Sequence, residues 1–326
     1  MHNSFGSRFK ITLFGASHAP ETGVHIDGIP AGIAISEEDF EEDLSARRAG
    51  AAGTTPRTER DIPHIGGLSN GRTDGGRVTV TFRNENIRSH DYSRFDEHPR
   101  PSHADFVARR RYGKNEDLAG GGIFSGRMTV GIVAASVAAK KVLPEGVRFS
   151  TRITEIGGCG NPQEFDDIIA RAAADGDSVG GVIECCAEGL PLGLGEPFFD
   201  SAESVMAHIL FSIPAVKGVE FGSGFSGAAL RGSQRNDRII NADGTTATNN
   251  EGGINGGLTN GNPMVVRVAV KPAASIGAEQ QTYHFGHGAI EPLTIGGRHD
   301  VCIALRARIV IEAAVAIALA DLYLQH

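Results

Sequence analysis

The stretch GVHIDGIPAGI at residues 23–33 has the pattern of a short strand that ends in a Gly-x-Pro-x-Gly turn. The stretch GVIECCAEGLPLGL at residues 181–194 has the same plan, and its turn begins about half of the 326-residue chain later. An acidic segment that predicts a helix follows each turn, at residues 36–48 and 201–210. The spacing predicts two related halves. The alternative is that this turn recurs by chance in a chain with 44 glycines.

Later segments correspond in the same way. Alternating apolar residues predict strands at residues 77–82 and 264–270. Ala-rich segments predict helices at residues 128–143 and 306–324, and their small residues on many sides indicate burial between sheets. No Pro/Ser-rich linker divides the chain. We therefore expect one pseudo-symmetric α+β domain over residues 1–326, with a site shared by the two halves.

Composition excludes several classes of protein. A formal net charge of -8 argues against a nucleic-acid binder, although a few arginines can still form a local anion pocket. The apolar stretches are too short for a membrane helix, and no signal pattern opens the sequence, so we expect a cytoplasmic protein. The four cysteines lack metal-ligand spacing, and the adjacent Cys185 and Cys186 would point to opposite strand faces, which predicts reduced thiols and no metal.

Three short motifs combine histidine with Ser, Arg or Asp. His18 ends the segment FGASH at residues 14–18, and His103 lies in RPSHAD at residues 100–105. The third motif is GRHDVC at residues 297–302. Such groups are suited to proton transfer and to anion binding.

Other segments have more than one interpretation. The Gly-rich residues 120–127 precede the first Ala-rich helix and could hold a phosphate on backbone N–H groups, or form an ordinary turn. The Gly/Asn-rich residues 249–263 could form a plain surface loop, but their length and few charges favour a loop packed against a planar ligand or a subunit. Arg47 and Arg48 end the first acidic helix, either as charges that complement the helix terminus or as an anion clamp.

These motifs, taken in order, resemble the chorismate synthase family over essentially the whole chain. The resemblance rests on the following segments: residues 3–6, 15–18, 47–48, 54–57, 89–92, 100–105, 120–127, 213–222, 224–225, 231–233, 236–237, 249–263, 271–272 and 297–300. A single match is weak, but this many in the family's order are specific.

The resemblance implies a reaction and a cofactor. The family removes phosphate and a ring proton from 5-enolpyruvylshikimate 3-phosphate by anti-1,4-elimination, which gives chorismate in the shikimate pathway of aromatic amino acid biosynthesis. It requires reduced FMN without net redox change. We expect an external flavin reductant, with NADPH only as an indirect source of electrons. The family also implies a β-α-β sandwich and a homotetramer.

The same resemblance assigns roles to residues. His18 matches the histidine that protonates the departing phosphate, and His103 the one that adjusts protonation of the reduced flavin. Asp300 matches the aspartate that assists proton removal by way of the flavin, with Arg298 expected to hold it ionised. The substrate-binding positions are Ser17, Arg47, Arg100 and Arg298. The FMN-binding positions are Ile123, Phe124, Ser125, Pro214, Ala215, Gly256, Lys271, Pro272, Ala273, Ala274, Ser275 and Arg298.

The chain also departs from the family pattern. Gly53 replaces a second arginine of the anion-binding group, and Ile123 replaces an Arg or His. Ala16, Ala19 and Val301 differ in the His18 and Asp300 motifs, and residues 69–76 lack the usual Thr-Thr-Gly-x-Pro pattern. The alternative function is therefore a flavin-binding or structural relative without catalysis.

Overall fold

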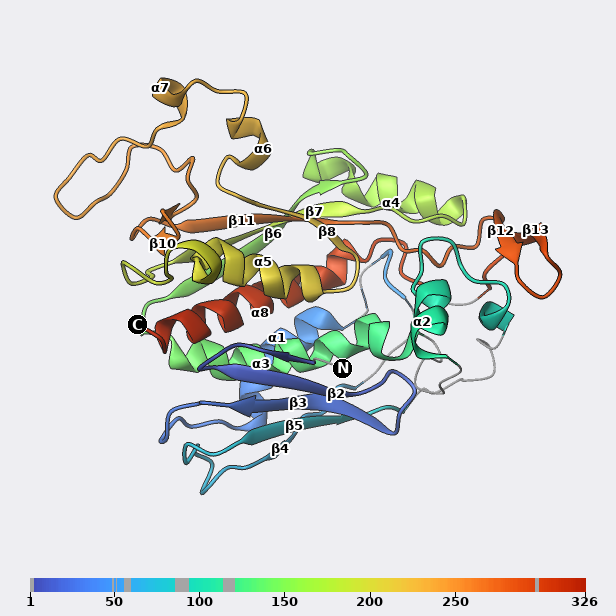
Figure 1. The fold of residues 1–326 in the computed structure, drawn as a ribbon, viewed down its shortest axis with the longest axis horizontal. Helices are drawn as coiled ribbons and strands as arrows, with labels where there is room; N and C mark the ends of the chain where they lie inside the picture. Colours follow the sequence, from blue (N-terminus) through green and yellow to red (C-terminus); the bar gives the residue numbers. More distant parts are fainter. Residues whose placement is uncertain are drawn as a thin grey trace.

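The computed structural model describes residues 3–48, 50, 52–55, 60–85, 94–113, 121–296 and 299–326. Its central helices form a layer between two antiparallel sheets, with the first sheet below and the second above in Figure 1. This is the β-α-β sandwich that the family resemblance implies.

The first sheet has the strand order β1-β2-β3-β5-β4, and all of its pairs are antiparallel. On β5, Val78, Val80 and Phe82 are buried, while the threonines between them are half-buried. One face of the sheet therefore packs against the helices. The strands are β1 (Ser4–Phe5), β2 (Lys10–Gly15), β3 (Glu21–Asp27), β4 (His64–Gly66) and β5 (Val78–Arg83).

The second sheet has the strand order β6-β7-β11-β8, again antiparallel throughout. On β7, Cys185 is buried and Cys186 is only half-buried, as their expected opposite orientation requires. All four cysteines are free thiols. The strands are β6 (Arg148–Ile156), β7 (Gly181–Glu188), β8 (Val216–Phe221) and β11 (Met264–Val270).

The two halves share one topology. The order β2-β3-β5-β4 in the first sheet corresponds to β6-β7-β11-β8 in the second. Helix α1 (Glu41–Arg47) follows β3 as α5 (Ala202–Ser212) follows β7, and α3 (Thr129–Val142) follows β5 as α8 (Ala304–Tyr323) follows β11. The predicted repeat is therefore confirmed by strand order and helix placement.

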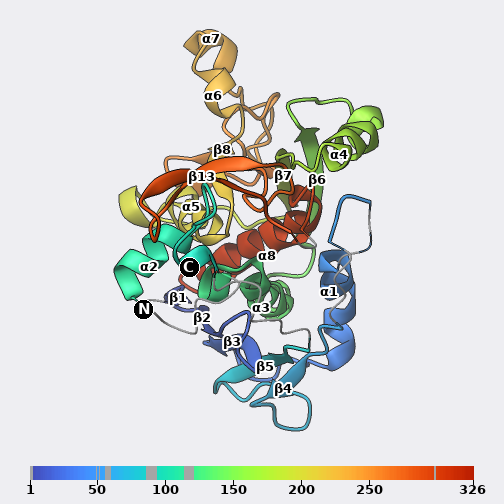
Figure 2. The same cartoon turned by 90° about the vertical axis from the view of Figure 1, so that its right-hand side faces the viewer.

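Helices α3 and α8 lie side by side at the centre of the sandwich (Figure 2). Most of their residues are buried, because each helix has a sheet on one side and another helix on the other. Gly131 of α3 lies over Gly23 of β3, since a Cβ on Gly131 would be 3.1 Å from the Gly23 carbonyl oxygen and 2.7 Å from Leu13. The absence of a side chain there lets the helix approach the sheet closely.

A partly buried ion cluster joins three helices of this layer and a strand of the second sheet. Lys140 of α3 contacts Asp43 of α1 at 2.8 Å and Glu312 of α8 at 2.9 Å. Thr151 of β6 donates its hydroxyl to Glu312 at 2.8 Å. Since each charge has a partner, the cluster avoids the large cost of an isolated buried ion.

The remaining elements extend from the two ends of the sandwich. Helix α2 and the β12–β13 hairpin lie at the right-hand end of Figure 1, and the α6–α7 arm projects at the upper left. No helix within the described residues has the length and apolarity to cross a membrane. The elements are α2 (Asp105–Tyr112), α4 (Phe165–Ala174), α6 (Gly224–Gly227), α7 (Gly232–Arg235), β9 (Ile254–Asn255), β10 (Leu258–Thr259), β12 (Gln280–His284), β13 (Ala289–Leu293), and the 3-10 turns η1 (Glu37–Phe40), η4 (Gly126–Met128), η5 (Pro162–Glu164) and η6 (Phe198–Asp200).

Asp321, near the end of α8, fixes the N-terminal segment. Its carboxylate accepts hydrogen bonds from the backbone N–H groups of Ser7, Arg8 and Phe9 at 2.9, 2.6 and 2.8 Å. The residue is 2% exposed. Three donors on one buried carboxylate tie the first strand pair to the central helix.

We predict that Asp321→Ala lowers the free energy of unfolding by about 3 kcal/mol, because it leaves three N–H donors without their charged acceptor. Denaturant unfolding would measure the change. Asp175→Ala, at an exposed position after α4, is the control and should change stability by less than about 0.5 kcal/mol. Equal effects of the two substitutions would contradict this role for Asp321.

Candidate active site

The segment from Arg100 to Asp105 forms a compact ion cluster. The Arg100 guanidinium donates to both carboxylate oxygens of Asp105 at 2.7 Å, and His103 Nδ1 lies 2.6 Å from the same carboxylate. Burial alone would raise the pKa of Asp105. The hydrogen bonds and charges of Arg100 and His103 outweigh burial and hold this pKa far below its usual range. Asp105 thereby orients both residues.

The segment after β11 lies against this cluster. Arg100 donates to the Ser275 hydroxyl at 3.0 Å, and Lys271 Nζ donates to the Ser102 carbonyl at 2.7 Å. Burial, with a smaller contribution from Lys217, lowers the pKa of Lys271. The structure therefore brings two predicted FMN-binding positions beside two predicted substrate-binding or catalytic positions.

The Gly-rich segment before α3 joins His103 to the His18 loop. A Cβ on Gly121 would lie 3.8 Å from two atoms of the His103 ring, and the Ser17 N–H donates to the Gly122 carbonyl at 3.3 Å. The Ser125 hydroxyl accepts from the Arg127 N–H at 3.2 Å, which caps the turn before α3. Hence Ser17, His18 and the 121–125 segment border the same region as His103.

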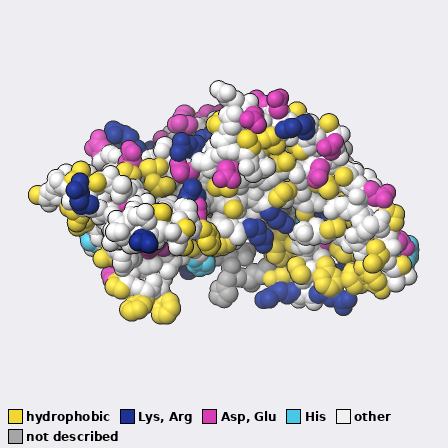
Figure 3. Space-filling view, turned by 90° about the horizontal axis from the view of Figure 1, so that it is seen from above, with side chains coloured by type: hydrophobic (Ala, Val, Ile, Leu, Met, Phe, Trp, Pro, Cys, Tyr) yellow, Lys and Arg dark blue, Asp and Glu magenta, His cyan; other side chains and the backbone are white. Residues whose placement is uncertain are grey.

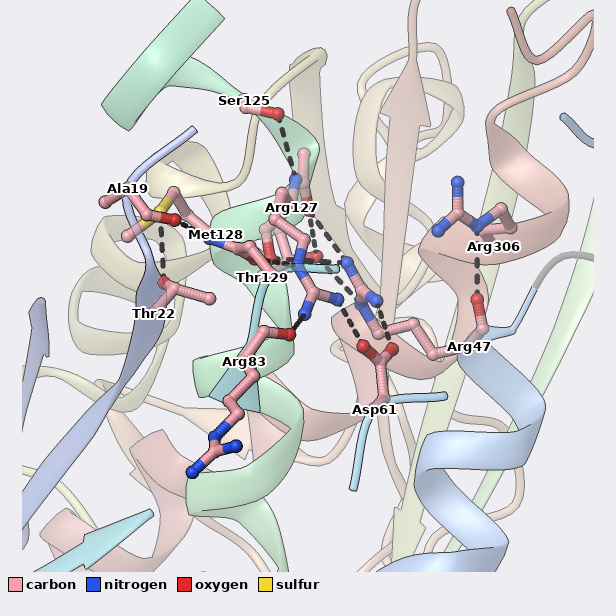
Figure 4. Close-up of polar contacts among 12 residues, drawn as sticks. Ala19, Thr22, Arg47, Asp61, Arg83, Ser125, Arg127, Met128, Thr129 and Arg306 are labelled. Atoms are coloured by element: carbon pink, nitrogen blue, oxygen red, sulfur yellow. Dashed lines mark hydrogen bonds and ion pairs between the residues drawn. The ribbon is translucent and has the colours of Figure 1, made fainter. Parts of the chain in front are cut away.

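Arg47 has a buried partner that neither interpretation of the sequence included. Its guanidinium contacts the Asp61 carboxylate at 3.0 Å, the Thr129 hydroxyl at 3.3 Å and the Gly126 carbonyl at 3.0 Å. Arg127 contacts the other oxygen of Asp61, so two guanidinium groups share one carboxylate (Figure 4). The Asp61 side chain is 2% exposed, and burial lowers the pKa of Arg47 to about 10.

Asp300 lies next to this arginine cluster. Its carboxylate accepts from the Thr55 N–H at 2.7 Å and from the Arg306 guanidinium at 3.1 Å. Arg306 also donates to the Arg47 carbonyl at 3.1 Å. The expected partner Arg298 lies outside the described residues, as do residues 56–57 and 89–92 of the predicted motifs.

His299 was given no role from the sequence, although it lies inside the third motif. The pKa of His299 is lowered, mainly because the side chain is buried. A hydrogen bond with the Gly296 backbone raises this pKa, and the charge of Arg100 lowers it further. Its Nε2 atom is buried and has no hydrogen-bond partner among the described residues. The lowered pKa favours the neutral imidazole, whose buried Nε2 atom is left in need of a hydrogen-bond partner.

Two helix N-termini face this region. Helices α3 and α8 both begin at the end of the sandwich where α2 lies (Figure 1). The partial positive charge of each N-terminus adds to that of the arginines. The combined field favours an anionic ligand.

Gly256 is the predicted site residue that the structure places elsewhere. It lies in the turn between β9 and β10, which packs at the Met264 end of β11. Lys271 directly follows the other end of β11. Because this strand has seven residues, Lys271 lies about 20 Å from its Met264 end. Two other predicted FMN-binding positions lie close to Lys271. The Ala215 carbonyl accepts from the Lys271 N–H at 2.9 Å, and Pro214 directly precedes Ala215.

Comparison with known proteins now identifies the family. A family model described as chorismate synthase matches residues 9–324. The chain belongs to the chorismate synthase family. A chorismate synthase of Chitinophaga pinensis is 53% identical over 323 residues, which are 99% of this chain and 96% of the relative. A chorismate synthase of Dehalococcoides mccartyi is 43% identical over 354 aligned residues, and the alignment covers 100% of this chain and 97% of the relative.

A crystal structure of chorismate synthase agrees with the fold. It superimposes with a TM-score of 0.77 at 26% sequence identity, and the match covers 98% of this chain and 93% of the other. The recognised family and its architecture are therefore both confirmed.

The departure at Gly53 from the chorismate synthase pattern has a physical reason in this chain. A Cβ there would lie 2.4 Å from Ile169, and the backbone φ is +87°. The Gly53 carbonyl accepts from the N–H groups of Val301 and Cys302 at 2.9 and 3.1 Å. An arginine at this position does not fit, and glycine instead fixes the segment that follows Asp300.

Four residues of the candidate site, Asp61, Arg127, His299 and Arg306, were not predicted from the sequence. Arg127 and His299 lie inside recognised motifs, so each could have been proposed from its position. Asp61 and Arg306 had no such signal, because neither belongs to a quoted motif and their partners are distant in sequence.

We predict that Asp61→Asn destabilises the chain by about 3–5 kcal/mol, because it leaves Arg47 and Arg127 buried without a counter-charge. Denaturant unfolding would measure this. The control is Asp27→Asn, which breaks a half-exposed pair with Arg77 and should cost no more than about 1 kcal/mol. A small effect at Asp61 would mean that the two arginines find other partners.

Proposed function

We propose that this chain is an active chorismate synthase that uses reduced FMN to convert 5-enolpyruvylshikimate 3-phosphate to chorismate. In the reaction a C–O bond to phosphate and a ring C–H bond break, and the ring gains a double bond. One observation carries the proposal. Segments 17–18, 100–105, 121–125, 271–275 and 299–300, distant in sequence, adjoin one another at one end of the sandwich.

The anionic substrate determines what the cations do. It carries a phosphate and two carboxylates, which match the planar donors of arginine. Arg100, Arg47 and Arg298 remain our proposed substrate contacts, together with Ser17. Arg47 and Arg127 share only one carboxylate, so this cluster keeps a net positive charge toward the site.

Proton transfer is assigned to three groups. His18 donates a proton to the departing phosphate oxygen, which makes it a better leaving group. His103, whose Nδ1 lies 2.6 Å from the Asp105 carboxylate, would adjust the protonation of the reduced flavin. Asp300, positioned by Thr55 and Arg306, is the carboxylate that would assist removal of the ring proton by way of the flavin.

The residues present fit a flavin phosphate cofactor. Lys271 and Ser275 supply a cation and a hydroxyl, and His299 Nε2 is a buried atom in need of a partner. We assign FMN contacts to Ser125, Pro214–Ala215, Lys271–Ser275, Arg298 and the flanking Ile123–Phe124. When bound, reduced FMN would supply electron density to the substrate without net redox change. An external reductant would supply the reduced cofactor, with NADPH acting only indirectly.

A homotetramer would account for apolar side chains on the surface. Phe198 and Phe199 are 86% and 91% exposed, and Phe225 is 83% exposed on the projecting arm. Apolar groups also protrude at the lower left edge of Figure 3. Large exposed aromatic residues are typical of subunit contacts. Gly256 could reach a flavin only in another copy of the chain.

We place the enzyme in the cytoplasm.

The deciding experiment is an anaerobic assay with reduced FMN and 5-enolpyruvylshikimate 3-phosphate. Formation of chorismate with release of phosphate supports the proposal. Binding of FMN without turnover would favour the alternative, a flavin-binding relative, to which Gly53 and Ile123 point. If the chain neither binds FMN nor turns over the substrate, both the proposed function and the alternative are overturned.

We predict that His18→Ala and His103→Ala each lower kcat by about 10²–10⁴-fold, the usual range for a lost acid or base. His64→Ala, on the exposed strand β4, is the control and should leave kcat unchanged. Thermal melting of all three variants should resemble the parent. Loss of stability with normal turnover in the soluble fraction would make the two histidines structural.

We predict that Asp300→Asn retains FMN and substrate binding but loses turnover. The amide oxygen can still accept from the Thr55 N–H, but it cannot take up a proton. FMN affinity and single-turnover rate should be measured on the same variant. The competing view makes Asp300 a structural partner of Arg306; weak FMN binding with a near-normal rate at saturating FMN would establish it.

A further inference from the structure

The β12–β13 hairpin carries a group of metal-ligating side chains apart from the candidate active site. His284, His287 and Glu291 each offer one ligand atom, and these atoms lie within 4.8 Å of one another. The two imidazole rings stack with centroids 3.8 Å apart and an angle of 3° between their planes. His287 Nδ1 lies 2.9 Å from a Glu291 oxygen. The three ligand atoms are therefore close together, but the stacked rings must turn before both nitrogens can point at one ion.

Two more ligating side chains border this group. The Glu97 carboxylate and the His284 ring lie 2.6 and 3.2 Å from the position that a Cβ on Gly286 would occupy. The His98 ring centroid is 4.8 Å from that of His284. His98 is 9% exposed, and its Nε2 has no partner among the described residues. A fourth ligand is thus available from either side chain.

The local charge favours a cation. Glu97 has no Lys or Arg ion-pair partner among the described residues, and the recorded ion-pair partner of Glu291 is His287. The nearby arginines are engaged elsewhere: Arg109 pairs with Asp96, and Arg110 lies over the Phe106 and Phe285 rings. Two carboxylates that have no Lys or Arg partner among the described residues, beside three imidazoles, form a site that a positive ion would stabilise.

We propose that His284, His287 and Glu291 bind a divalent transition-metal ion of the Zn²⁺ type, with Glu97 or His98 as the fourth ligand. Imidazole and carboxylate groups together suit Zn²⁺, whereas Ca²⁺ and Mg²⁺ take oxygen ligands. Bonds of about 2.0–2.2 Å require the ligand atoms to approach by about 1 Å. The side chains of a hairpin turn can make this change by rotation.

The bound ion would fasten the hairpin to the segment that leads into Arg100. Two hydrogen bonds already join them: Phe285 N–H to the Glu97 carbonyl at 2.7 Å, and the Thr282 hydroxyl to the Pro99 carbonyl at 3.2 Å. A ligand from Glu97 or His98 would add a third connection. The site would therefore stiffen the support of the Arg100–Asp105 cluster, and its existence does not depend on the proposed function.

Calorimetric titration of the 326-residue, tag-free chain with Zn²⁺ tests the proposal. After treatment with a chelator, the parent should bind one ion at this site. His287→Ala and Glu291→Gln should each weaken binding at least about tenfold. His64→Ala, an exposed histidine on the other sheet, is the matched control and should bind as the parent does. No binding by the parent, or equal binding by all four proteins, would overturn the proposal.

Thermal melting supplies an independent readout. Zn²⁺ should raise the melting temperature of the parent and of His64→Ala, because an ion that binds only the native state stabilises it. It should not raise that of His287→Ala, whose melting temperature without metal should equal that of the parent. A similar rise in every variant would place the ion elsewhere and overturn the assignment.

Discussion

The packing of helix α3 against helix α8 is the contact on which the rest of the structure depends. Both helices are buried along most of their length between the two sheets. Neither sheet could bury its apolar face without them. The close approach at Gly131 and the ion cluster around Lys140 fix how the helices sit against the sheets and each other. Because the two helices occupy equivalent places in the two halves, this contact also creates the pseudo-symmetry.

That pseudo-symmetry explains where the candidate active site lies. His103 lies in the chain between β5 and α3, and Asp300 in the chain between β11 and α8. Both helices begin at the same end of the sandwich (Figure 1). Two halves packed in this way bring distant motifs together without a long-range covalent link. They also direct two helix N-termini toward the place where an anionic substrate would bind. One candidate site is thus built from two similar units.

Two buried carboxylates organise the cations of this site. Asp105 holds Arg100 and His103, and Asp61 holds Arg47 and Arg127. In each case one negative charge orients two cationic or potentially cationic groups, so that little rearrangement is needed when a ligand arrives. The cost is a dependence on each carboxylate, because its loss leaves buried charges without a partner.

The sequence alone determined several strands and helices of the two halves, the repeat and the family. The strand at residues 264–270 was placed at its observed bounds, and the helix expected at residues 128–143 is Thr129–Val142. Periodicity and motif order are local properties, so they can be read along the chain. The partners of Arg47 and Asp300, and the separation of Gly256 from Lys271, were decided only by the tertiary structure. Whether two charges meet depends on how the sheets and helices stack, and no spacing along the chain encodes that distance.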